Sequence, residues 1–116
     1  LYRLNKYCIV DLPAAKQLSE NNLKKHNVVT LTDTLDNPDL TIAEYSITEQ
    51  DADTLLDLTD NHLMSSKYIF IRNNILDKSL NDQFLNRLRE KYNVDKYREE
   101  PDIVSINSIL WCERKT

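Results

Sequence analysis

The stretch Tyr7-Cys8-Ile9-Val10-Asp11-Leu12-Pro13 decides the fold class of this chain. It is a short apolar run followed by an acidic residue and a proline, a pattern typical of a buried strand that leads into a helix. In an α/β protein the carboxyl end of such a strand lies where small ligands bind. Asp11 could therefore accept hydrogen bonds from ribose hydroxyls, or it could instead cap the helix; the pattern favours neither role.

Composition indicates a globular domain with no electrostatic signal for a polyanionic partner. With 41% hydrophobic and 29% charged residues in 116, the chain can bury a core without staples. The formal net charge of -4 predicts binding neither to nucleic acid nor to an anionic membrane, and no apolar run is long enough to cross a bilayer. Cys8 and Cys112 lie in apolar runs, so we expect buried thiols in a reducing, cytoplasmic compartment.

Glycine is absent from the chain, against an average usage of about 7%. Without glycine, a left-handed backbone conformation costs free energy, and a Cβ atom hinders close approach of the main chain to a phosphate or sugar. We therefore expect any Gly-rich ligand loop to lie outside residues 1–116 or to have been lost. The chain would then be either a single domain or the C-terminal portion of a larger one, with a sheet that is incomplete at its N-terminus.

Apolar runs alternate with helical patterns along the chain. A helix is expected over residues 13–27, and the two others follow capping patterns at 48–51 and at 79–82. Strands are expected at 7–10, 28–32, 40–45, 68–71, 94–97 and 106–112. Because the main strands read as continuous apolar runs, they predict an α/β fold: a doubly wound, mostly parallel sheet with helices on both faces.

Polar residues at the carboxyl ends of these strands are the candidate site. They are Asp11, Thr32, Asp33, Glu44 to Glu49, and Asn73. Glu49 could be a general base or a first-turn glutamate that complements a helix dipole, and its position favours the second reading. Ser46 has no histidine at local spacing, which argues against a nucleophilic triad. Neither His26 nor His62 has a metal-ligand partner at i+3 or i+4, so no metal site is predicted.

Five blocks of sequence, in order, resemble the bacterial sugar O-methyltransferases, a family of class I, Rossmann-like enzymes that use S-adenosylmethionine. The blocks are Val10–Pro13, Asp39–Glu49, Tyr68–Asn73, Glu99–Pro101 and Asn107–Trp111. The resemblance spans nearly the whole chain, although each block alone is weakly specific. It implies a Rossmann-like fold and methyl transfer to a hydroxyl of a sugar or sugar-containing molecule.

The resemblance also implies roles for individual residues. Asp11, with Leu12 beside it, would bind the ribose of S-adenosylmethionine, and the turn at Thr32 and Asp33 would lie near the adenine. Three further residues would face the methyl-transfer site: Tyr45, Ser46 and Glu49. Glu49 is the candidate for the base that takes the acceptor proton.

Departures from the family pattern leave other functions open. The family's first strand and Gly-rich turn have no counterpart here, Glu44 replaces a small amide, and Lys67 replaces a glycine. Without the central strand, two halves of the sheet would expose unpaired edges. The alternative is a non-catalytic α/β protein-interaction domain, either BRCT-like or a degenerate methyltransferase. The oligomeric state is not predicted.

Overall fold

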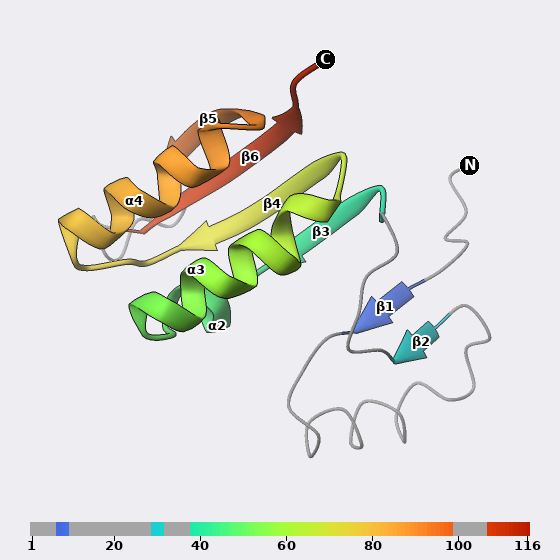
Figure 1. Ribbon diagram of the computed structural model, residues 1–116, viewed down its shortest axis with the longest axis horizontal. Helices are drawn as coiled ribbons and strands as arrows, with labels where there is room; N and C mark the ends of the chain where they lie inside the picture. Colours follow the sequence, from blue (N-terminus) through green and yellow to red (C-terminus); the bar gives the residue numbers. More distant parts are fainter. Residues whose placement is uncertain (1–6, 10–28, 32–37, 99–106) are drawn as a thin grey trace. The chain divides into compact units, whose positions relative to one another are not determined.

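A computed structural model describes residues 7–9, 29–31, 38–98 and 107–116 (Figure 1). The chain forms two compact units, Leu1–Asp36 and Asn37–Thr116. In the first unit, strands β1 (Tyr7–Ile9) and β2 (Val29–Leu31) pair in parallel. These strands confirm the first two that the sequence predicts. The expected helix at 13–27 lies outside the described residues.

The second unit is built on a four-stranded sheet in the order β3-β4-β6-β5. Its strands are β3 (Leu40–Ala43), β4 (Tyr68–Asn73), β5 (Tyr92–Arg98) and β6 (Ser108–Arg114). Strands β3 and β4 are parallel, whereas β6 runs antiparallel to both of its neighbours, β4 and β5. The helical segments are α2 (Tyr45–Thr48), α3 (Ala52–Asn61), the short 3-10 helix η1 (Leu63–Ser65) and α4 (Lys78–Arg89). The fold is therefore of the predicted α/β class.

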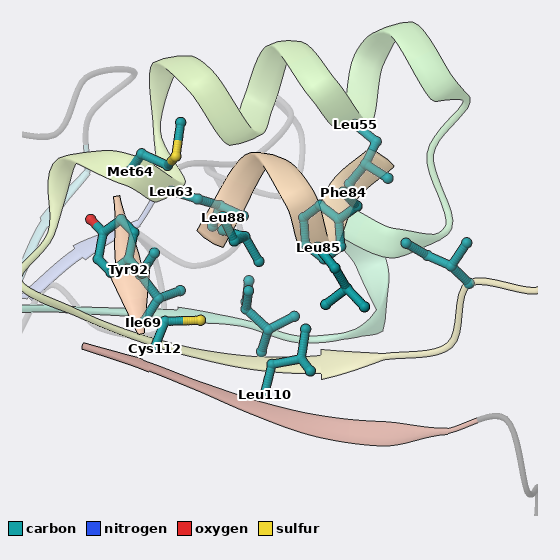
Figure 2. Close-up of a cluster of buried hydrophobic side chains, with 13 residues drawn as sticks. Leu55, Leu63, Met64, Ile69, Phe84, Leu85, Leu88, Tyr92, Leu110 and Cys112 are labelled. Carbon is teal, nitrogen blue, oxygen red and sulfur yellow. The ribbon is translucent and has the colours of Figure 1, made fainter. Parts of the chain in front are cut away.

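A hydrophobic core joins α3 and α4 to one face of this sheet (Figures 1 and 2). Strand β4 alternates strictly: Ile69 and Ile71 are buried on the core face, and Tyr68 and Phe70 are partly exposed on the other. This period of two is the pleat of a strand. The two helices and β6 supply Leu55, Phe84, Leu85, Leu88, Leu110 and Cys112, and the rest of the core comes from β3, η1, the loop after β4 and β5.

The opposite face of the sheet is apolar as well. The rings of Tyr68 and Trp111 stack there with their centroids 5.5 Å apart. Leu40, Ile42 and Tyr97 remain 45%, 59% and 55% exposed. Such a face differs from the polar outer face that a sheet normally turns to water.

Helix starts differ from the predicted ones because the capping carboxylates lie elsewhere. The expected capping box at 48–51 does not cap; Asp51 caps α3 instead and accepts from the Thr54 backbone N at 2.9 Å. The hydrogen bonds from Thr54 also lower the pKa of the Asp51 carboxyl. Likewise, Asp77 rather than Ser79 caps α4, accepting from Leu80 N at 3.1 Å. A carboxylate at the N-cap satisfies a backbone donor that the helix itself cannot.

Strand β3 is shorter than the sequence predicts. The expected strand at 40–45 ends at Ala43, and α2 begins at Tyr45 after the extended Glu44.

None of the helices in the described part of the chain has the length and the apolar character that a bilayer-spanning segment requires.

Cys112 is a free thiol in the core, as the sequence predicts. Burial raises its pKa to about 12, and the Asp95 carboxylate adds to this rise. Burial also raises the pKa of Tyr92, whose hydroxyl donates to the Ser66 carbonyl. Both groups therefore favour their neutral forms in the folded chain.

A matched pair of truncations tests the core. Leu88→Ala removes a fully buried side chain, so we expect the free energy of unfolding to fall by about 2–5 kcal/mol. The same change at Leu76, which is 81% exposed, should change it by less than about 0.5 kcal/mol. Chemical denaturation measures both, and equal effects would contradict the described core.

Alkaline pH should destabilise the chain through Cys112. Because its folded pKa of about 12 exceeds the ordinary value of 9.0, the stability that the neutral thiol provides is complete below pH 9 and is lost as the pH rises toward 12.

We expect iodoacetamide at neutral pH to leave Cys112 unmodified in the folded chain and to modify it in guanidinium, as measured by peptide mass spectrometry. Equal labelling in both states would show that the thiol is accessible.

Candidate functional site

A pocket of about 400 Å³ opens beyond the carboxyl end of β4. It lies between the end of α2, the loop that follows β4, and the first turn of α4. The lining residues are Thr48, Glu49, Asn74, Ile75, Leu76, Asp77 and Leu80. The carboxyl edge of the parallel β3–β4 pair is where an α/β sheet places a ligand site.

The loop that lines this pocket is held by Asn73, the last residue of β4. Asn73 is 3% exposed and uses both ends of its amide: Oδ1 accepts from Ile75 N at 3.0 Å, and Nδ2 donates to Asn81 Oδ1 at 2.8 Å. The buried Ile75 anchors the same loop in the core. These contacts tie the loop to both β4 and α4.

Three polar side chains meet on one wall of the pocket. Thr48 is 5% exposed, and its hydroxyl donates to Asn74 Oδ1 and also lies 3.1 Å from the Tyr45 carbonyl. Asn74 Nδ2 donates in turn to Glu49 Oε1 at 3.0 Å. Glu49 itself is exposed at the C-cap of α2. The wall thus presents an oriented carboxylate to the pocket.

The charge of the pocket is negative. Glu49 and Asp77 contribute carboxyl groups, and none of the described residues that line it is lysine, arginine or histidine. Ile75, Leu76 and Leu80 supply an apolar wall. This lining suits a ligand with hydroxyl groups and an apolar side, and it disfavours an anion.

A second polar cluster gathers around Tyr45. The guanidinium of Arg72 lies 4.9 Å from the centre of the Tyr45 ring and donates to its hydroxyl at 3.4 Å. Asn107 donates to the same hydroxyl at 3.5 Å. Arg72 also pairs with Glu44 at 3.3 Å, but both side chains are exposed enough for water to weaken this pair. Glu44 therefore has a structural partner in this chain.

The structure separates the predicted site residues into groups. Tyr45 is the first residue of α2 and Glu49 is its C-cap, and the Glu49 backbone N donates to the Tyr45 carbonyl at 2.9 Å. Their side chains have different hydrogen-bond partners. Ser46 lies between them in α2. The four remaining candidates, Asp11, Leu12, Thr32 and Asp33, lie outside the described residues.

Sequence reasoning missed the partners of Glu49. The pattern at 48–51 predicts a capping role for Thr48, and the candidate site residues end at Asn73, one position before Asn74. A polar residue just beyond the carboxyl end of a buried strand is the signal that could have identified Asn74. Within the described residues, no group of three or more His, Cys, Asp or Glu side chains could hold a metal ion.

Comparisons with known proteins support the fold. No protein-family model matches the chain, and no curated protein sequence matches it. A solved structure described as a "putative rRNA-methylase" from Clostridium thermocellum is similar over 96% of this chain and 73% of that one, with a TM-score of 0.66 and 12% sequence identity. At this identity the similarity shows a methyltransferase-like α/β fold and nothing about the substrate. The rRNA in that description refers to the Clostridium thermocellum protein.

Loss of the Asn73 amide should loosen the pocket. Asn73→Ala leaves the buried Ile75 N–H without its acceptor, so we expect a loss of about 1–3 kcal/mol in unfolding free energy and faster amide exchange at Ile75. Asn73→Asp keeps the acceptor oxygen and should preserve the protection of Ile75 better. Equal exchange in both variants and the unmodified chain would show that the side chain does not hold the loop.

Proposed function

We propose that this chain belongs to a methyltransferase domain that uses S-adenosylmethionine to methylate a hydroxyl group of a small, uncharged, sugar-containing molecule. The observation that carries this proposal is the pocket at the carboxyl edge of β3 and β4, with Glu49 on its wall. The methyltransferase-like fold supports the same reaction class. Sequence resemblance supports the choice of a sugar acceptor.

The described residues fit the chemistry of the cofactor side. S-adenosylmethionine carries a sulfonium cation, and Glu49 provides an exposed carboxylate at the edge of the sheet, after α2. Tyr45 at the start of α2 supplies an aromatic ring, and Arg72 contacts both this ring and the neighbouring Glu44 carboxylate. Asp11 and Leu12 are the proposed ribose contacts, and Thr32 and Asp33 are the proposed residues near the adenine.

Glu49 would receive the proton of the reaction. When bound, S-adenosylmethionine would supply an electrophilic methyl group to the acceptor oxygen, and S-adenosylhomocysteine would be the leaving group. The hydroxyl proton of the acceptor goes to the Glu49 carboxylate, which keeps charge balanced at the oxygen. The apolar wall of Ile75, Leu76 and Leu80 would orient the acceptor and limit water around it.

The charge of the pocket favours an uncharged acceptor over RNA. A phosphate-bearing substrate would have to approach Glu49 and Asp77 with no cation among the described lining residues. The net charge of -4 also opposes binding to a polyanion. The reaction named for the Clostridium thermocellum protein is therefore the less favoured reading for this chain.

A protein-interaction domain is the second candidate. The apolar face of the sheet that carries Ile42, Tyr97 and Trp111 favours it, because exposed apolar patches often mark contacts with partners. This candidate requires no cofactor. Binding of S-adenosylhomocysteine therefore separates the two functions.

Calorimetric titration with S-adenosylhomocysteine tests the proposed cofactor. We expect binding by the 116-residue chain and at least about tenfold weaker binding by Asp11→Asn, which keeps the size of the side chain and removes its charge. Asp39→Asn is the matched control, since Asp39 is an exposed aspartate that precedes β3. A folded chain that does not bind would contradict the methyltransferase proposal.

Transfer of a labelled methyl group tests the acceptor and the base. We expect label in methyl glucoside and little in glucose 6-phosphate or RNA. Glu49→Gln should slow the transfer by about 100-fold, because it removes the proton acceptor, and should leave S-adenosylhomocysteine binding unchanged. Label in RNA alone would contradict the proposed acceptor, and full activity in Glu49→Gln would contradict the proposed base.

A further inference from the structure

Asn74 connects two elements that line the pocket. Its side chain belongs to the loop after β4, and both of its partners, Thr48 and Glu49, belong to the end of α2. We propose that Asn74 is a positioning residue that holds the Glu49 carboxylate in one orientation toward the pocket. This inference rests on the proposed function, because that function gives Glu49 its role.

The direction of the Asn74 amide follows from the charge of Glu49. A hydroxyl such as that of Thr48 can donate to an oxygen or accept from a nitrogen, so it tolerates either end of the amide. A carboxylate only accepts, and the opposite orientation would place the Asn74 oxygen against Glu49. The amide nitrogen therefore faces Glu49, as the 3.0 Å contact shows, and the oxygen accepts from Thr48.

Both ends of this connection are anchored. Thr48 is buried and lies 3.1 Å from the Tyr45 carbonyl. On the other side, the two hydrogen bonds of Asn73 fix the loop that carries Asn74. An exposed glutamate normally samples several rotamers, so a partner held this firmly restricts its motion.

The hydrogen bond engages one oxygen of the carboxylate. Asn74 donates to Oε1 of Glu49. The second oxygen, Oε2, is the atom that would receive the acceptor proton. Asn74 thus acts through Glu49 and does not itself touch the reacting atoms.

Nuclear magnetic resonance of the 116-residue chain tests the positioning directly. We expect the scalar couplings of the Glu49 side chain to report one χ1 rotamer in the unmodified chain and averaged rotamers in Asn74→Ala. Asn74→Asp, which lacks the donor and retains the size, should give the same averaging. Thr48→Val should also increase it, whereas Thr48→Ser should restore the single rotamer.

Asn86→Ala is the matched control, because Asn86 is an exposed asparagine on α4 that does not line the pocket. It should leave the Glu49 couplings unchanged. A second signature is the side-chain amide resonance of Asn74, which should shift in Glu49→Ala. Averaged Glu49 rotamers in the unmodified chain, or a single rotamer in both Asn74 variants, would overturn the inference.

These measurements need neither cofactor nor acceptor, so they separate the two proposals. A single Glu49 rotamer that depends on Asn74 supports the positioning role even if methyl transfer fails. Conversely, active methyl transfer that requires Glu49 but shows no rotamer dependence on Asn74 supports the proposed function and overturns the positioning role.

Discussion

The inward face of β4 is the constraint on which the rest of the four-stranded unit depends. Ile69 and Ile71 are fully buried beneath the helices, and the pleat then places Asn73 inward at the end of the strand. A buried amide must find partners, and Asn73 finds them in Ile75 and Asn81. Core packing and loop shape are therefore set by the same strand.

The candidate site follows from how β3 and β4 are joined. Because the two strands are parallel, their carboxyl ends lie at one edge of the sheet, where α2 and the loop after β4 meet. This brings Glu49 within hydrogen-bonding distance of Asn74, which lies 25 positions further along the chain. The pocket at this edge carries the carboxylates of Glu49 and Asp77, and it is the pocket to which we assign the proposed methyl transfer.

Local patterns in the sequence predicted the class of the fold and most of its strands. The apolar run at 68–71 needs no partner to be recognised, and it became the core of β4. The sequence pattern misplaces the helix starts because several residues in each polar turn could serve as the N-cap. Asp51 and Asp77 are the N-caps in the structure, because their carboxylates accept hydrogen bonds from Thr54 N and Leu80 N. A local pattern can mark Asn74 as a strand-end residue, but its hydrogen bond to Glu49 arises from tertiary structure, so no local pattern pairs the two residues.

A titration of the ¹⁵N-labelled chain with S-adenosylhomocysteine and then methyl glucoside tests the central claim most directly, because backbone resonances show where each molecule binds. Addition of the glycoside to the chain already saturated with S-adenosylhomocysteine should shift the resonances of residues 48–49 and 74–77, which line the pocket. Shifts confined to the apolar face around Ile42, Tyr97 and Trp111, or no shifts in a folded chain, would contradict the assignment of this pocket as the acceptor site.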